Sequence, residues 1–157
     1  MKSLICLCLF VALPLSTPLP ASNAVNFRAV LSGDNEVPPV DTETSGTALL
    51  HVNQQLTEIT IKLDISNADN ILGAAGAHLH CAPEGSNGPV VAFIAGAFTP
   101  GYDGSVQLRA TLNDSNITNV TCGATIADLV ESMLDGQVYL NVHSAAWPGG
   151  VIRDQVQ

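Results

Sequence analysis

Two histidines stand two positions apart in the stretch GAHLHCAPEGSNGPVV, residues 76–91, and a cysteine follows them directly. In a β-strand, residues i and i+2 point to the same face, so His78 and His80 are expected to project together. The segment YLNVHS carries a third imidazole, that of His143, on a second expected strand. If the two strands are neighbours, the three histidines converge. Neutral imidazole is a ligand for zinc, copper and iron, so this spacing predicts one bound transition metal ion.

Other polar side chains are candidates for completing this site. Tyr139 and Asn141 share one strand face with His143, and together with Glu36 they are the candidates for a fourth ligand. Iron or copper is favoured as the ion, with zinc as an alternative. Tyr139 is also a candidate catalytic group. Arg153 is the cation close in sequence to His143; it either guides a small anion to the site or pairs with a carboxylate, and pairing is the favoured interpretation. A pair of solvated or hydrogen-bonded histidines without metal is the alternative to the whole site.

The elements that must position these side chains are mostly strands. In the run 56–66, apolar and polar residues alternate, which is typical of a half-buried antiparallel strand. The single good helix pattern follows Thr125, a plausible N-cap, and ends at Asp135 and Gly136. Seven or eight short strands with one short helix predict an all-β fold, a Greek-key β-sandwich or barrel. The expected strands are residues 26–32, 46–53, 56–66, 76–81, 89–94, 105–111, 137–144 and 151–156.

The first 24 residues have the pattern of a secretory signal peptide. A short basic region at Lys2 is followed by an apolar run and then by small residues, and cleavage is expected after Ala21 or Ala24. An uncleaved anchor is the alternative. The remainder, residues 25–157, is expected to be one domain, secreted or extracytoplasmic, with no membrane span.

Two cysteines remain in this exported part, Cys81 and Cys122. A disulfide between them is the simplest expectation in an oxidising compartment, and it closes a loop of about 40 residues. The alternative is Cys81 as a thiolate metal ligand beside the histidines. The loop NDSNITNVT holds three overlapping sequons, which make Asn113, Asn116 and Asn119 candidate glycosylation sites if the chain passes through a eukaryotic secretory pathway.

The charge balance excludes some partners. The whole chain has 14 acidic and 5 basic residues, and one of the basic residues, Lys2, lies in the predicted signal peptide. Such an acidic chain is not expected to bind nucleic acid or an anionic membrane surface. No Gly-x-Ser-x-Gly elbow and no phosphate-binding loop occurs in the sequence.

Three blocks of the sequence together resemble the CHRD domain, a family first described in chordin. They are LSGDNEVPPVDTETSGTA (31–48), AHLHCAPEGSNGPVVA (77–92) and YLNVHSAAWPGGVIRDQ (139–155), and they occur in the order of the family. Two departures occur in the third block. Val151 stands where the pattern usually has an acidic residue, and Asp154 stands where it usually has glycine.

The resemblance implies an exported all-β protein. In chordin, the domains belong to an extracellular antagonist of bone morphogenetic proteins. The histidines of the family motif correspond to His78, His80 and His143, which adds to the metal interpretation. The expected Greek-key architecture is similar to that of superoxide dismutases or of immunoglobulin domains, which is an analogy of fold alone.

Three functions remain open at this stage. The first is a mononuclear three-histidine metal protein, redox-active in the manner of a superoxide dismutase and acting on a small anionic substrate. The second is an extracellular module that binds another protein through its loops, with structural histidines. The third is a structural component of a wall or matrix. The sequence does not indicate an oligomeric state.

Overall fold

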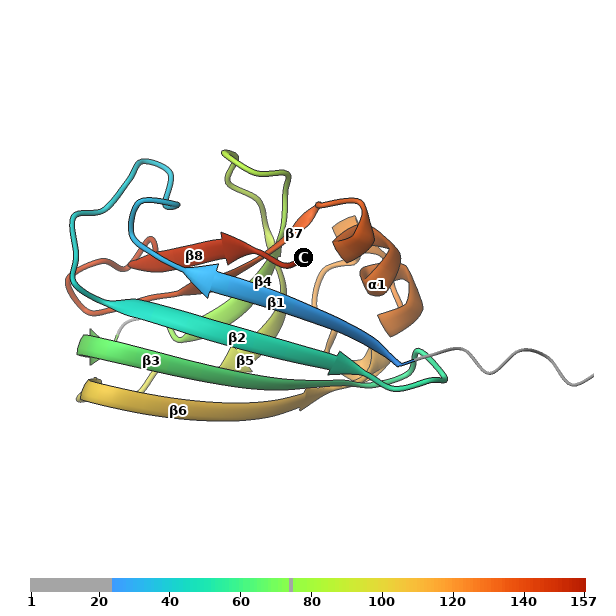
Figure 1. Ribbon diagram of the computed structural model, residues 1–157, viewed down its shortest axis with the longest axis horizontal. Helices are drawn as coiled ribbons and strands as arrows, with labels where there is room; N and C mark the ends of the chain where they lie inside the picture. Colours follow the sequence, from blue (N-terminus) through green and yellow to red (C-terminus); the bar gives the residue numbers. More distant parts are fainter. Residues whose placement is uncertain (1–23, 74) are drawn as a thin grey trace, which may run out of the picture.

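The computed structural model describes residues 24–73 and 75–157, and this part of the chain is mainly β-strand. The predicted signal peptide lies outside the described residues apart from Ala24. Within the described part, eight strands form two four-stranded antiparallel sheets that face each other (Figure 1). The predicted all-β sandwich with one short helix is confirmed, whereas the Greek-key class, superoxide dismutase-like or immunoglobulin-like, stays a prediction.

The first sheet has the strand order β1-β2-β3-β6 (Figure 1). Its apolar residues alternate because only one face meets the core. Leu50 of β2 and Ile61 of β3 are fully buried, whereas their neighbours Leu49 and Lys62 face the opposite side. The bounds of its strands are β1 Val25–Leu31, β2 Ser45–Val52, β3 Ile59–Ile71 and β6 Tyr102–Leu112.

The expected strand 56–66 differs from β3 at both ends. β3 begins only at Ile59, because the side chain of Asn53 accepts hydrogen bonds from the backbone N–H groups of two residues in the turn that precedes it. β3 then continues to Ile71 through two shifts in its register with β6. A pattern of period two is interrupted at such irregularities, so alternation alone does not reveal the extension.

The second sheet has the strand order β5-β4-β7-β8. Ala77 and Leu79 of β4 are fully buried in the core between the sheets. His78 and His80 therefore lie on the outer side of this sheet, which loops cover rather than solvent. The bounds of its strands are β5 Val90–Ala95, β4 Ala77–Cys81, β7 Val138–Val142 and β8 Ile152–Gln155.

The connection from β6 to β7 contains the helical segments. Two short 3-10 turns, η1 (Asp114–Asn116) and η2 (Val120–Cys122), precede helix α1 (Ile126–Leu134). The predicted N-cap of α1 is confirmed, because the side chain of Thr125 accepts a hydrogen bond from the N–H of Asp128. The apolar residues of α1 are buried and pack into the core; they are Ile126, Leu129, Val130 and Met133. Among the described residues, no helix combines the length and apolar character needed to cross a membrane.

Candidate metal centre

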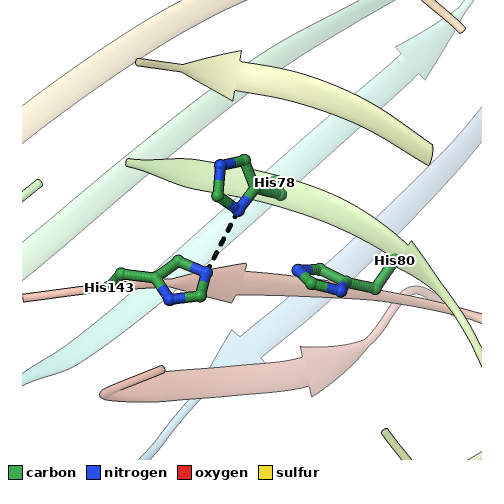
Figure 2. A group of neighbouring side chains, drawn as sticks. All are labelled: His78, His80 and His143. Carbon is green, nitrogen blue, oxygen red and sulfur yellow. Dashed lines mark hydrogen bonds between the residues drawn. The ribbon is translucent and has the colours of Figure 1, made fainter. Parts of the chain in front are cut away.

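The three predicted metal ligands come together on the outer side of the second sheet. His78 and His80 project from β4, and His143 follows the last residue of β7 (Figure 2). β4 and β7 pair directly, with His78 opposite Asn141 and His80 opposite Tyr139. The backbone N–H of His143 donates to the carbonyl of the residue before β4, which continues this pairing by one further step. Strand pairing therefore fixes the positions from which the three imidazoles converge.

The ring nitrogens have the spacing of ligands that share one ion. One nitrogen from each histidine can be chosen so that all three lie within 4.8 Å of one another. Nδ1 of His78 lies 3.1 Å from Nε2 of His143 (Figure 2). Two nitrogens that bind the same ion at about 2.0–2.1 Å are separated by about 3 to 3.5 Å, so this distance fits a shared metal.

Backbone carbonyls orient two of the three rings. Nδ1 of His80 donates to the carbonyl oxygen of Gly88 at 2.9 Å, and Nδ1 of His143 donates to that of Pro148 at 2.9 Å. A carbonyl can only accept, so each Nδ1 carries the proton and each Nε2 keeps its lone pair. Metal-bound histidines almost always have their second nitrogen held in this way. Nε2 of His80 is buried and has no hydrogen-bond partner, as expected of a nitrogen whose lone pair is available to bind a metal ion.

Burial keeps the three imidazoles neutral. Removal from water, together with the neighbouring imidazoles His143 and His80, lowers the pKa of His78 to about 4. Removal from water likewise lowers the pKa values of His80 and His143. All three rings are therefore neutral at neutral pH, with lone pairs available for a metal. The donor set, the spacing and the orphaned nitrogen all fit a transition metal ion.

The candidate fourth ligands lie beside this cluster but have other partners. The buried carboxylate of Glu36 accepts a hydrogen bond from Nδ2 of Asn141 at 2.8 Å, while Oδ1 of Asn141 has no partner. The hydroxyl of Tyr139 accepts from the N–H of Gly88 at 3.2 Å. The group close enough to share an ion comprises the three histidines and no carboxylate of the described residues. A fourth protein ligand stays a prediction.

Burial also changes the acidity of Glu36. Removal from water raises the pKa of its carboxyl to about 7, although the hydrogen bond from Asn141 and the positive charge of Arg153 each lower it. Gly150 leaves room for this pair, because a Cβ there would lie 2.6 Å from Nδ2 of Asn141 and 2.7 Å from Oε1 of Glu36. A carboxyl group beside the histidine cluster therefore holds or releases a proton near neutral pH.

Arg153 of β8 is buried and pairs with Asn141 of β7. Its guanidinium donates to Oδ1 of Asn87 at 2.9 Å and to the carbonyl of Ser86 at 3.1 Å. It also lies 4.3 Å from the ring centre of Tyr139, whose ring stacks on His80 at 4.8 Å. No acidic side chain of the described residues lies within 4.0 Å of the guanidinium, although its positive charge lowers the pKa of Glu36, so pairing with a carboxylate stays a prediction. The role of anion guide stays a prediction.

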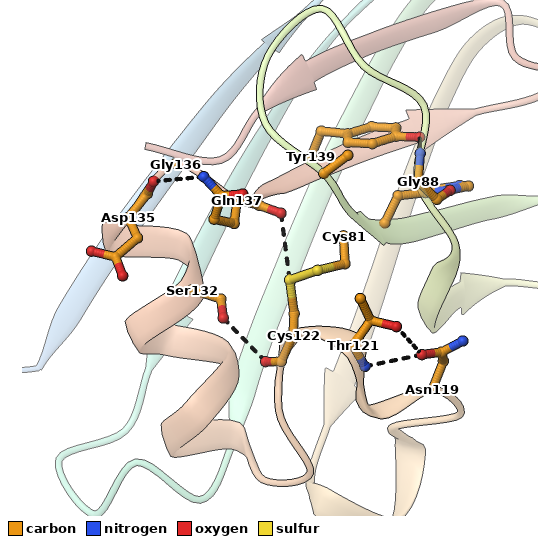
Figure 3. The surroundings of a disulfide bond; sticks show 12 residues. Cys81, Gly88, Asn119, Thr121, Cys122, Ser132, Asp135, Gly136, Gln137 and Tyr139 are labelled. Carbon is orange, nitrogen blue, oxygen red and sulfur yellow. Dashed lines mark hydrogen bonds between the residues drawn. A yellow bond between two sulfur atoms is a disulfide. The ribbon is translucent and has the colours of Figure 1, made fainter.

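The predicted disulfide between Cys81 and Cys122 is confirmed (Figure 3). It ties the end of β4, immediately after His80, to η2 and spans 41 positions of the chain. Cys81 is therefore not a thiolate ligand beside the histidines. The disulfide instead fastens the strand that carries two of them.

The three sequon asparagines take part in the local turns. Asn113 caps η1 and Asn119 caps η2, and each side chain accepts a hydrogen bond from the backbone N–H two residues later. The side chain of Asn116 accepts from the N–H of Asn113. Their glycosylation stays a prediction.

Some contributors to the site have no signal in the sequence. The ring of Phe93 lies edge-on to His78, at 4.6 Å between ring centres. The orienting carbonyls of Gly88 and Pro148 belong to loops, and any residue type carries a carbonyl. Of these two positions, only position 88 requires a particular residue type: it must be glycine, because a Cβ there would collide with the carbonyl of Cys81.

Comparison with known proteins gives one match. The family model described as CHRD domain matches residues 27–156, which include all three histidines and both disulfide cysteines. No curated protein and no solved structure matches the chain. The match covers nearly the whole described part of the chain, which therefore belongs to the CHRD domain family.

Proposed function

We propose that this protein is an extracytoplasmic metal protein that binds one transition metal ion through His78, His80 and His143. The observation that carries the proposal is the convergence of three buried ring nitrogens within 4.8 Å. Two of these rings have their other nitrogen held by a backbone carbonyl, so the lone pairs already point into a common space. Little reorganisation is then needed when an ion binds.

The electrostatics of the cluster favour a small anion as a further ligand. Three neutral imidazoles add no negative charge to that of the ion, and Arg153 adds a buried positive charge nearby. A bound iron or copper ion would supply one-electron exchange. Superoxide dismutation needs that exchange and two protons: one superoxide is oxidised to dioxygen, and the electron it gives up, together with two protons, converts a second superoxide to hydrogen peroxide.

Residues around the histidines have roles consistent with this proposal. Tyr139 stacks on His80 and contacts Arg153, so it holds the ligand ring and the cation in a fixed relation. Glu36, with its pKa raised to about 7, keeps its proton below neutral pH and exchanges it near neutral pH. The disulfide supports an extracytoplasmic location, since such bonds persist in oxidising compartments.

Superoxide decay in the presence of protein reconstituted with iron or copper tests the redox part of the proposal. The wild type is expected to accelerate the decay, and His78→Ala is expected to abolish the acceleration. His51→Ala is the matched control, because His51 is exposed on β2 and hydrogen-bonds to Asn26 away from the cluster. A metal-loaded wild type that leaves the decay unchanged would contradict the redox assignment. An extracellular interaction module, the alternative function, would bind its partner equally well in the histidine variants.

A further inference from the structure

In the part of the chain that the structure describes, exposed positive charge is confined to the outer face of the first sheet. Residues 24–157 contain four basic side chains, the five of the whole chain less Lys2, against 14 acidic ones. Arg153 is buried, and the other three lie on the outer face of the first sheet. These three are Arg28, Lys62 and Arg109.

Strand register places the three cations on a single line. Arg28 of β1 pairs with Leu49 of β2, Leu49 pairs with Lys62 of β3, and Lys62 pairs with Arg109 of β6. The line crosses all four strands of the sheet, whose order can be followed in Figure 1. Neighbouring strands are about 4.8 Å apart, so it is about 14 Å long. We call this line of four residues, Arg28, Leu49, Lys62 and Arg109, the basic row.

The charge of the basic row is partly compensated, because Asp154 lies at the edge of β1 and accepts a hydrogen bond from the N–H of Val30 at 2.6 Å. Asp64 is the one acid in the two flanking rows of paired residues, and it forms an ion pair with Lys62 at 2.6 Å. The guanidinium groups of Arg28 and Arg109 make no hydrogen bond or ion pair with the described residues. Besides the hydrogen bond from Lys62, the charge of Arg109 also lowers the pKa of the Asp64 carboxyl. Three cations with one acid in the flanking rows leave the row with net positive charge, which is complementary to an extended anion.

The residues beside the basic row narrow the class of anion. Apart from the exposed Val30, the residues of the flanking rows are polar, and their hydroxyl and amide groups can hydrogen-bond to sugar hydroxyls. Phe, Tyr and Trp are absent from the three rows, so no aromatic platform is present on which nucleic-acid bases could stack. The flanking residues are Asn26, His51, Thr60 and Thr111 on one side and Val30, Thr47, Asp64 and Gln107 on the other.

We propose that the outer face of the first sheet binds an extended acidic polysaccharide, whose anionic groups contact Arg28, Lys62 and Arg109. This surface lies on the opposite side of the sandwich from the outer face that carries His78 and His80. A polysaccharide bound there leaves the histidine cluster uncovered. The inference does not depend on the proposed metal function, because it uses none of the same residues.

Binding of polygalacturonate, a linear polyuronate, tests this inference directly. The wild-type protein is expected to bind it at about 0.01 M salt and to release it at about 1 M salt, because the contacts are exposed charge pairs. Dextran provides a neutral polysaccharide control, and duplex DNA provides a second polyanion. Failure of the wild type to bind polygalacturonate at low salt would overturn the proposal. Equal binding of dextran, or tighter binding of DNA, would overturn the assigned class of partner.

Charge variants identify the surface. The triple variant Arg28→Gln, Lys62→Gln, Arg109→Gln is expected to bind polygalacturonate more weakly by on the order of tenfold or more. The matched variant Arg28→Lys, Arg109→Lys keeps the charges and is expected to retain binding. Asp64→Asn removes the acid beside the row and is expected to strengthen binding. Circular dichroism establishes that each variant is folded, and a folded triple variant that binds like the wild type would refute the basic row as the site.

Discussion

Replacing Glu36 by glutamine in the metal-free protein tests the electrostatics of the polar cluster beside the histidines. The carboxyl of Glu36 is buried, accepts a hydrogen bond from Asn141 and forms no ion pair with the described residues. Burial raises its pKa from 4.5 to about 7, against the lowering effects of Asn141 and Arg153. Glutamine keeps the hydrogen-bond acceptor and removes the ionisation.

The sign and the size of the effect follow from this pKa. Below pH 4.5 the folded and unfolded states both hold the proton, so Glu36 causes no pH dependence of the free energy of unfolding. Between pH 4.5 and about 7 the unfolded state releases the proton while the folded state keeps it, so stability falls as the pH rises. The full loss is about 3 kcal/mol. Glu36→Gln removes this loss, so the variant becomes more stable relative to the wild type by that amount as the pH rises.

Urea unfolding with a chelator present, followed by circular dichroism over this pH range, measures the effect. The difference between variant and wild type is the informative quantity, because His78 contributes an opposite dependence. Its pKa is lowered to about 4 in the folded state, so the stability it supports is lost as the pH falls from 6.5. Asp34→Asn, on an exposed residue of the same loop, controls for the change in net charge. A difference that does not change with pH, or that favours the wild type at high pH, would refute this account of Glu36.

Three further predictions concern the framework and the histidines. Replacing Cys81 and Cys122 together by serine should lower the free energy of unfolding by about 3–4 kcal/mol, because the unfolded chain is no longer constrained by a loop spanning 41 positions. Urea unfolding measures this difference, and an unchanged midpoint urea concentration would contradict it. Thr125→Ala should cost about 1 kcal/mol in the same melts through loss of the N-cap of α1, whereas Thr125→Ser should cost little. Bound metal, measured after dialysis, should be retained below pH 6.5, because burial lowers the pKa values of all three histidines; loss near 6.5 would contradict the burial argument.

Much of the histidine geometry could be predicted from local sequence, because strand alternation is a local property. His78 and His80 share a face since they are two positions apart, and Leu79 between them is buried. The metal hypothesis assumed that the two histidine-bearing strands are neighbours, and the sequence alone does not predict this pairing of β4 with β7. It depends on contacts between segments about 60 residues apart, as in the pair His78 and Asn141.

The surroundings of Arg153 show what local patterns cannot supply. Its guanidinium contacts Asn87, Ser86 and Tyr139, which come from a loop and from a neighbouring strand. From the sequence, a carboxylate is the expected partner of a buried arginine. In the structure, the guanidinium contacts a backbone carbonyl, a side-chain amide and an aromatic ring instead. The basic row was missed for the same reason, since strands distant in sequence bring its residues into one line.

The central claim, a three-histidine metal centre, is tested most directly by elemental analysis of the protein folded with iron, copper or zinc and then dialysed. The account predicts about one ion per chain in the wild type and in the control His51→Ala, since a single cluster is formed by the described residues. It predicts loss of the ion from His78→Ala, His80→Ala and His143→Ala, each verified as folded. A wild type that retains no metal, or three cluster variants that retain as much as the control, would contradict it.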